Sequence, residues 1–292
     1  LQNPMLAVAG TSEKPVVNLH FEGLRVRYVD WPLPPWGYMA MFCCNVSTDG
    51  PKPGHRPIEA SVEFNHAQKC SFSDGAITDA GGMGLCLREG TSEIAIEGNE
   101  IGNLGGGGIA LGWCNVAALY LDAAAPPAPG EFTKYLIANN YIHDCGEDYF
   151  GAVGILLEGA SGSVVSHNLI RDTAYFGIGV AGTQDPKVTF GGDNLIEFNH
   201  IHDTMKTTID GAAIYVTFAQ KNGGSHFVGN VIHDTHGNPN HEHDGQKWGD
   251  HPPSAGFYLD GKTSDGDYEQ NLLYRNFAAG PLIFNYDGAQ AN

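Results

Sequence analysis

The chain has 292 residues and a formal net charge of −18, from 15 Lys and Arg against 33 Asp and Glu. Such a negative surface repels phosphate backbones and anionic lipid headgroups, so we expect no nucleic-acid partner and no membrane partner. The 42% hydrophobic content allows a sizeable core, and the 40 glycines follow no Gly-x-y period, which excludes collagen. No run of 18 apolar residues occurs, so the sequence contains no candidate membrane-spanning helix.

The first 69 residues are the least regular part of the chain. Short apolar runs at 16–19 and 60–64 predict two strands. Between them, the segments 31–36 and 51–57 are rich in proline, which indicates loops. We therefore expect the region 1–69 to form irregular coils of whatever fold the rest of the chain adopts.

From residue 70 onward, two short phrases alternate along the chain. The first has the form Asn-x-Ile, with Leu in place of Ile in the last copy, and starts at Asn99, Asn140, Asn168, Asn199, Asn230 and Asn271. The second has the form Gly-Ile-x-Leu and starts at Gly84, Gly108, Gly154, Gly177, Ala213 and Gly256. Both phrases alternate apolar with other residues over three to five positions, which predicts short strands with one face turned inward.

Strands that recur in this way describe coils, and a coil buries its inner face only when another coil stacks on it. The sequence therefore predicts an all-β, right-handed parallel β-helix over residues 1–292, with about nine coils spaced about 4.8 Å apart. We expect regular coils over 70–292, interrupted by an Ala- and Pro-rich insertion at 123–130 and a polar loop at 235–254. Because the chain ends without a polar cap, we also expect it to be part of a longer polypeptide.

The recurring Asn predicts an inward turn residue. Its amide can bond to the same amide on the coils above and below, which would form a ladder through the stack. Asn also tolerates the left-handed backbone conformation that such turns require.

Six scattered cysteines contain no C-x-x-C pair, so the sequence lacks the usual signature of structural zinc or of thioredoxin-like redox chemistry. Cys70, Cys86 and Cys114 lie inside apolar runs, so we expect these three to be small buried hydrophobic residues. We expect no cofactor and no metal site.

The polar loop at 235–254 is dense in imidazoles and carboxylates. His241 and His243 form a weak zinc pattern without a third ligand at fixed spacing. The loop is either solvated or in contact with substrate, in which case Trp248 would stack on a sugar ring and His243 or Lys247 would reach sugar hydroxyls.

Two aspartates depart from the repeat. Asp210 precedes the phrase that contains Tyr215, and Asp260 follows the phrase that contains Tyr258. Each carboxylate could cap a turn by accepting backbone N–H groups. The alternative is a catalytic pair on neighbouring coils, with the two tyrosines binding sugar rings.

The alignment of the phrases restricts this pairing. The position just after each second phrase holds Arg88, Gly112, Glu158, Ala181, Thr217, Asp260 and Asn285, which form one column. Asp210 aligns seven positions before that column, a separation of more than 20 Å along a straight strand at about 3.3 Å per residue. The pair therefore requires a sharp bend near Gly211, whereas Glu158 lies three coils from Asp260, about 14 Å away.

Outward histidines form another predicted column, in which His143, His202 and His233 share a position with Arg171 and Tyr274. Stacked repeat positions are usually structural. His202 and His233 are nevertheless candidates for donating to substrate hydroxyls.

The phrases Asp210-Gly-Ala-Ala-Ile-Tyr215 and Gly256-Phe-Tyr-Leu-Asp-Gly261, with Gly229-Asn-Val-Ile-His-Asp234 between them, resemble β-helix proteins related to glycoside hydrolase family 141. The resemblance extends over most of the chain. It implies a carbohydrate substrate, Asp210 and Asp260 as catalytic carboxylates, and an extracellular or periplasmic location. The activities of that family include α-L-fucosidase and xylanase, so the resemblance does not identify the sugar.

Two other functions fit the same fold. A polysaccharide lyase or uronan epimerase would require a local pair of cations, such as Lys187 and Lys206, or calcium held by acidic loops, and a lyase would leave an unsaturated product. A non-catalytic glycan-binding module would tolerate replacement of both aspartates.

Overall fold

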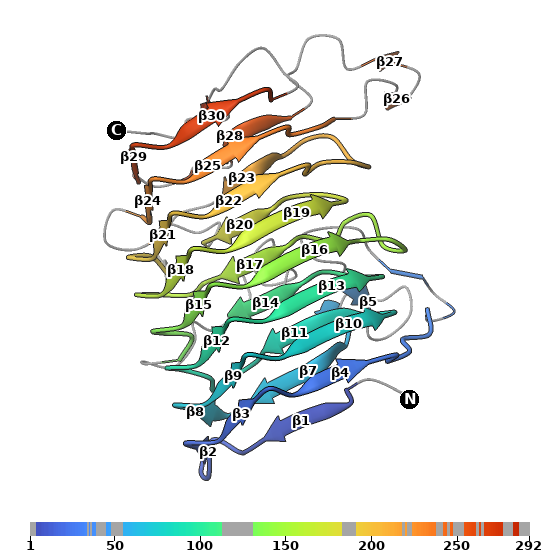
Figure 1. Ribbon diagram of the computed structural model, residues 1–292, viewed down its shortest axis with the longest axis vertical. Helices are drawn as coiled ribbons and strands as arrows, with labels where there is room; N and C mark the ends of the chain where they lie inside the picture. Colours follow the sequence, from blue (N-terminus) through green and yellow to red (C-terminus); the bar gives the residue numbers. More distant parts are fainter. Residues whose placement is uncertain are drawn as a thin grey trace.

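The structure of the protein is a computed structural model, shown in Figure 1. Backbone and side chains are described for residues 4–33, 35, 37–38, 58–112, 131–182, 191–217, 220, 224–237, 254–260, 263 and 266–276. The backbone alone is described for five further strands, at 45–47, 55–57, 242–243, 246–247 and 283–285.

The chain winds into a stack of coils whose strands form three parallel sheets (Figure 1). The sheet that we call sheet A has nine strands, in the order β1 (Leu6–Ala9), β7 (Ala60–Asn65), β11 (Met83–Leu87), β14 (Ile109–Gly112), β17 (Ile155–Glu158), β20 (Ile178–Ala181), β23 (Ala212–Thr217), β28 (Ala255–Asp260) and β31 (Ile283–Asn285). Nine strands agree with the predicted number of coils, and the expected right-handed parallel β-helix is confirmed.

The other two sheets have eight strands each. Sheet B consists of β3 (His20–Glu22), β9 (Ser71–Ser73), β12 (Ala95–Glu97), β15 (Leu136–Ala138), β18 (Val164–Ser166), β21 (Leu195–Glu197), β24 (His226–Val228) and β29 (Asp267–Glu269). Sheet C consists of β4 (Arg25–Arg27), β10 (Ala76–Ala80), β13 (Glu100–Leu104), β16 (Tyr141–Cys145), β19 (Leu169–Thr173), β22 (His200–His202), β25 (Val231–His233) and β30 (Leu272–Tyr274). Among the described residues, no helix has the length and apolar character needed to cross a membrane.

Within the described part of the chain, three short strand pairs lie outside these sheets. Strands β2 (Val16–Val17) and β8 (Ala67–Gln68) pair in parallel, whereas β5 (Asn45–Ser47) and β6 (His55–Pro57) are antiparallel. A second antiparallel pair, β26 (Glu242–His243) and β27 (Gln246–Lys247), lies within the 235–254 insertion, which was expected to be a loop.

The N-terminal region is more regular than its sequence suggested. Strand β1 pairs in register with β7, placing Leu6 opposite Val62, and β3 and β4 pair with β9 and β10. A complete first coil therefore forms within the segment that was expected to be irregular.

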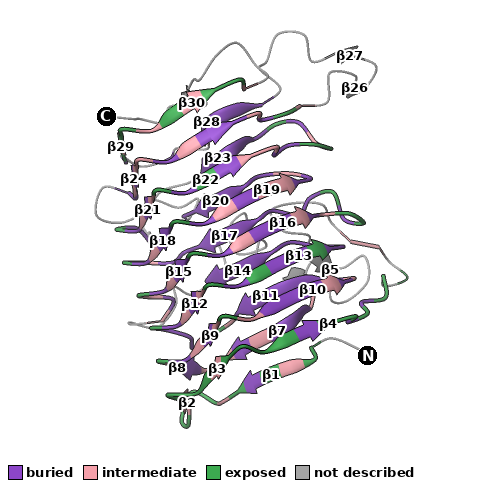
Figure 2. Ribbon diagram, in the orientation of Figure 1, coloured by how far each residue is buried: buried purple, intermediate pink, exposed green. Residues whose placement is uncertain are grey.

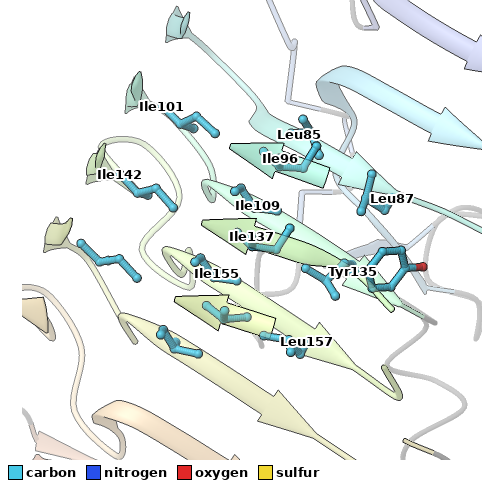
Figure 3. Packing of buried hydrophobic residues seen from close by; sticks show 14 of the residues in the cluster. Leu85, Leu87, Ile96, Ile101, Ile109, Tyr135, Ile137, Ile142, Ile155 and Leu157 are labelled. Atoms are coloured by element: carbon cyan, nitrogen blue, oxygen red, sulfur yellow. The ribbon is translucent and has the colours of Figure 1, made fainter. Parts of the chain in front are cut away.

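The core runs along the inside of the stack. In each sheet, apolar residues at equivalent positions of successive coils lie above one another (Figure 3). In sheet C, Ile101 lies opposite Ile142, and in sheet B, Ile96 lies opposite Ile137. All four are fully buried. This is the alternation that the two repeated phrases predicted.

The predicted asparagine ladder is confirmed. The side-chain amide of each Asn donates to the carboxamide oxygen of the Asn on the next coil, at 2.9–3.0 Å, through Asn99, Asn140, Asn168, Asn199, Asn230 and Asn271. The same oxygen accepts the backbone N–H of the preceding Asn, and each amide also donates to a backbone carbonyl one coil back. The ladder thus satisfies polar groups that the turn would otherwise bury unpaired.

The left-handed backbone conformation falls one residue before each ladder Asn. Positive φ values occur at Gly98, Asn139, His167, Phe198, Gly229 and Gln270, at 51–70°. The expectation that Asn itself supplies this conformation is therefore wrong. The Asn side chain instead forms the hydrogen bonds across the turn, and the residue before it adopts the left-handed conformation that turns the chain.

Replacing Asn168 with Ala is expected to destabilise the fold strongly. The change removes the amide that donates to Ile137 and Asn199 and the oxygen that accepts from Asn140. Buried polar groups left unpaired cost about 1–3 kcal/mol each, so we expect a loss of at least about 3 kcal/mol in the free energy of unfolding, measured by denaturant titration. Asn65→Ala, which removes bonds at a less buried site, is the control, and an equal loss in both variants would contradict the ladder's role.

Candidate functional site

The outer face of sheet A differs from the outer faces of sheets B and C. Strands β17, β20 and β23 are buried on both faces, whereas strands such as β4 and β30 carry exposed residues (Figure 2). A second apolar cluster covers this outer face and includes Trp31, Tyr149, Phe176, Tyr215 and Tyr258. A covered sheet face of this kind holds side chains away from water. Asp260 is the last residue of β28 in this sheet, and Asp210 lies two residues before the start of β23.

The predicted alignment of coils holds on this face. Tyr215 lies opposite Tyr258, and Thr217 lies opposite Asp260. The column continues back through Ala181, Glu158 and Gly112. Its expected last member is wrong, because β31 places Asn285 opposite Leu259, one position earlier.

Asp260 is half-buried at the end of β28 and is held by two neighbours. The phenol of Tyr215 donates a hydrogen bond to its Oδ2. Thr263 fixes the backbone, because its hydroxyl donates to the carbonyls of Asp260 and of Val216, the latter at 2.9 Å. The carboxylate therefore receives a specific donor from the neighbouring coil.

The ring of Tyr215 is fixed by other aromatic rings. It lies parallel to Phe176, with 4.3 Å between centroids and 4° between planes. Tyr258 meets it edge-on, at 5.2 Å and 75°. Tyr215 is 5% exposed and Tyr258 is 9% exposed, so neither ring presents an open face for stacking a sugar in this structure.

The electrostatics of Tyr215 connect the two candidate aspartates. Burial raises the pKa of this phenol well above its ordinary value, and the charge of Asp260 and its hydrogen bond raise it further. The nearby Tyr175 and the charge of Asp210 add smaller effects in the same direction. The phenol is therefore a neutral donor at any physiological pH, and both carboxylates act on it.

The chain bends at Asp210, which is exposed and has a φ of 63°, in the left-handed region, two residues before β23. The register of β23 with β28 runs from Ala212 opposite Ala255 to Thr217 opposite Asp260, so this bend precedes the start of β23, whereas Asp260 ends β28. The hydroxyl of Tyr175 donates to the backbone carbonyl of Asp210 at 2.8 Å. At Gly211, an added Cβ would overlap Cε1 of Phe176, so the turn is pressed against that ring.

Tyr175 and Phe176 were not predicted as site residues. They stack on each other with 3.7 Å between ring centroids and connect the Asp210 turn to Tyr215. A signal was available, since this aromatic pair directly precedes the phrase that starts at Gly177, on the coil before Asp210.

His202 and His233 lie in the predicted column but on sheet C, a different sheet from Asp260. Nδ1 of His202 bonds to Asp203 at 2.7 Å, and Nδ1 of His233 bonds to Asp234 at 2.6 Å. Nε2 of His233 also bonds to Nε2 of His200, at 2.7 Å. The bond between His200 and His233, and the 4.9 Å parallel stack of the rings of His202 and His233, connect neighbouring coils.

The predicted residues of the insertion are placed only in part. Trp248 lies outside the described residues. His243 and Lys247 are described through their backbones, which place them on β26 and β27, opposite Gln246 and Glu242.

A further carboxyl group lies in the Asp260 column. Glu158, three coils away, is 1% exposed, and its Oε1 has no hydrogen-bond partner among the residues that the structure describes. Burial, with a smaller effect from Cys86, raises the pKa of Glu158 to about 8. Glu158 is therefore a neutral acid at neutral pH.

Metal ligands do not cluster in the described part of the chain. Within that part, no group of three or more His, Cys, Asp or Glu residues is placed to hold a metal ion. The groups that the described site offers for chemistry are its carboxyls and its phenol.

Comparison with known proteins identifies the architecture. A family profile described as "Right handed beta helix region" matches residues 128–277, just over half of the chain. A solved glycoside hydrolase is similar over 92% of this chain with a TM-score of 0.64 and 19% identity, and the chain spans 48% of its length.

Two further solved structures are more distant. An alginate lyase from Paenibacillus sp. str. FPU-7 has a TM-score of 0.47 and 12% identity, over 94% of this chain and 88% of its own. A mannuronan C-5 epimerase A-module from Azotobacter vinelandii has a TM-score of 0.46 and 14% identity, over 90% of this chain and 74% of its own. No curated protein matches the chain.

Replacing Glu158 with Gln is expected to change how stability depends on pH. With the folded pKa raised to about 8 from an ordinary 4.5, the folded protein retains a proton that the unfolded chain releases. The stability that this proton contributes is full below pH 4.5 and is lost as the pH rises through 8, at about 1.4 kcal/mol per pKa unit. Gln cannot ionise, so the variant does not lose this stability at high pH. The unfolding free energy of the variant minus that of wild type should therefore be more favourable to the variant at pH 8.5 than at pH 5, measured by denaturant titration. An equal difference at both pH values would contradict this assignment.

Gly211→Ala is expected to damage the Asp210 turn. The added methyl group would overlap Phe176, and overpacking of this kind costs about 1–3 kcal/mol. Gly179→Ala, on the same face one coil earlier, is the matched control, because its Cβ would meet the flexible end of Leu156 at 3.0 Å. Thermal melts should show the larger loss for Gly211→Ala, and equal melting temperatures would refute the tight contact.

Proposed function

The chain belongs to the right-handed β-helix family, and we propose that it is a glycoside hydrolase that uses the carboxyl groups of Asp210 and Asp260. The observation that supports this most directly is the phenol of Tyr215, which bonds to Asp260 and also lies in the field of Asp210. The effect of both carboxyl groups on one buried phenol is what supports treating them as a pair. The similarity to a solved glycoside hydrolase is a similarity of fold and adds no residue roles.

Glycoside hydrolysis fits such a pair chemically. One carboxylic acid gives its proton to the glycosidic oxygen as the bond to the anomeric carbon breaks, and the electron pair of that bond leaves with the oxygen. The other carboxylate either takes a proton from the attacking water or attacks the carbon itself, forming an ester that water then hydrolyses. In both cases one glycosidic bond and one water molecule become two hydroxyl groups.

The proposed substrate is a neutral, plant-type polysaccharide or oligosaccharide. A chain with a net charge of −18 repels polyanionic glycans, which favours neutral sugars. Stacked coils offer a row of equivalent positions, which suits an elongated ligand. Such a substrate implies an extracellular or periplasmic location.

The insertion is part of the same proposal. It leads directly into β28, which ends at Asp260, so its side chains are the candidates for contacts with substrate. Trp248 is proposed to stack on a sugar ring, with His243 and Lys247 reaching hydroxyl groups. The buried rings of Tyr215 and Tyr258 are assigned to support the carboxylates rather than to bind sugar.

Asp260→Asn and Asp210→Asn are expected to reduce hydrolysis by about 100-fold to 10,000-fold, because each removes a group that transfers a proton or attacks the anomeric carbon. Activity is measured as release of reducing ends from neutral plant polysaccharides and of the chromophore from aryl glycosides. Asp267→Asn is the control, because Asp267 lies on β29 and bonds to His226 at 2.8 Å. Undiminished turnover by folded Asp210 and Asp260 variants would reject the proposal.

The same assays separate the alternatives. A lyase would release products with an unsaturated sugar that absorbs ultraviolet light, and an epimerase would change the sugar composition without shortening the chain. A glycan-binding module would retain glycan affinity in both aspartate variants and show no turnover in the wild type. Each of these outcomes would replace hydrolysis as the function.

A further inference from the structure

We propose that the turn that carries Phe150 is a separate glycan-binding subsite, at which a neutral sugar ring stacks on the exposed phenyl ring. The inference takes its class of ligand from the proposed function, but it depends on neither candidate aspartate. It begins with one side chain. Phe150 is 48% exposed, although its ring contacts Tyr38, which packs against the apolar cluster over sheet A.

Other aromatic rings hold Phe150 in place. Its ring meets that of Tyr38 with 6.0 Å between centroids, and Tyr38 meets Tyr149 at 4.8 Å. Tyr149 in turn meets Trp31 edge-on at 5.0 Å, and these last two rings are both buried. A ring supported in this way loses little freedom when a ligand covers it, so more of the contact energy appears as affinity.

The backbone of the turn is also fixed to the coils on both sides. The N–H of Tyr149 donates to the carbonyl of Gly105 on the coil before, at 2.8 Å, and the N–H of Tyr175 on the coil after donates to the carbonyl of Ala152, at 3.2 Å. The N–H of Ala152 donates to the carbonyl of Tyr149 at 3.0 Å, which closes a tight turn with Phe150 at its corner. The turn therefore presents Phe150 to solvent from a rigid support.

Carboxylates precede the exposed ring in the same turn. Glu147 and Asp148 are both exposed. Oδ2 of Asp148 lies over Gly105, where an added Cβ would come within 2.9 Å of it. Carboxylate oxygens accept hydrogen bonds from hydroxyl groups and repel anions. An apolar ring beside such acceptors suits a sugar with an apolar face and free hydroxyl groups, and the negative charge favours a neutral sugar over a uronate.

The turn lies at the same corner of the coil as one part of the proposed site. Phe150 precedes β17, Tyr175 precedes β20 and Asp210 precedes β23, which are neighbouring strands of sheet A (Figure 1). At about 4.8 Å per coil, the Phe150 turn lies about 10 Å along the stack from the Asp210 turn. An oligosaccharide that follows the stack can contact both turns, whereas a single sugar at either turn does not reach the other.

The test measures binding rather than turnover. Retardation of the Asp260→Asn protein in gels that contain xyloglucan, arabinoxylan or galactomannan gives its affinity for each neutral glycan. Phe150→Ala in this background removes the ring and should weaken binding about 10-fold. Phe150→Trp retains an aromatic ring and should bind at least as tightly as the parent.

Phe198→Ala is the matched control. Phe198 is 50% exposed and its ring lies 5.4 Å from that of His167, at the corner between sheets B and C. This variant loses an equally exposed phenyl ring at a different corner, so it should leave retardation unchanged. Equal affinity of Phe150→Ala and its parent would overturn the inference, as would a parent that none of the three glycans retards.

Two further measurements test other occupants of the turn. If polygalacturonate retards the parent more than the neutral glycans do, and Phe150→Ala abolishes that retardation, the ligand is an anionic glycan and the inference is wrong. If sedimentation shows a dimer that Phe150→Ala dissociates, the turn binds a second copy of the chain, which also overturns the inference.

Failure of the proposed function is distinguished from failure of the subsite. Glycan binding that depends on Phe150, in a protein that releases no reducing ends, would retain the subsite and reject hydrolysis. In an active protein, Phe150→Ala should raise KM for the polysaccharide about 10-fold and change kcat/KM for an aryl monoglycoside less, because a single sugar does not span the two turns. An unchanged KM for the polysaccharide would reject the subsite and leave hydrolysis standing.

Discussion

The hydrogen bonds between neighbouring coils are the constraint on which the rest of the structure depends. Parallel strands place each residue above its counterpart, and the buried asparagine ladder fixes which residue that is. A slip of one residue would turn every inward side chain outward and leave the ladder amides unpaired. The contact between Tyr215 and Asp260 exists because this register places Tyr215 opposite Tyr258 and Thr217 opposite Asp260.

Most of the fold could be predicted because the amino-acid sequence repeats the same two phrases in successive coils. The alternation around Ile101 and Ile142 shows the inward face, and the spacing of the Asn residues shows where each coil turns. The first coil was harder to predict, because β1, β3 and β4 are short and lack the repeated phrases. Their pairing with later strands depends on contacts between residues more than 45 positions apart in the sequence, and no local sequence pattern predicts such contacts.

The site could be predicted in part. Counting positions within the repeat placed Thr217 opposite Asp260 correctly and failed at Asn285, where the last phrase is degenerate. The sequence could show that a bend near Gly211 was needed, but the observed turn depends on the left-handed conformation of Asp210 and on the contact of Gly211 with Phe176 from the coil before. Aromatic layers of this kind come from packing between coils, and single positions in a sequence do not specify them.

The repeat also separates structural aspartates from the candidate pair. Asp144, Asp172, Asp203 and Asp234 close the turns that follow sheet C, and each has a histidine, arginine or lysine partner within 4 Å. At Asp234, the Arg275 guanidinium and then His233 lower the pKa of the carboxyl, so its charge is neutralised within the turn. Asp260 instead accepts a hydrogen bond from the phenol of Tyr215. The repeat thus pairs its turn aspartates with basic groups, whereas the side-chain donor that the described residues provide to Asp260 is a neutral hydroxyl group.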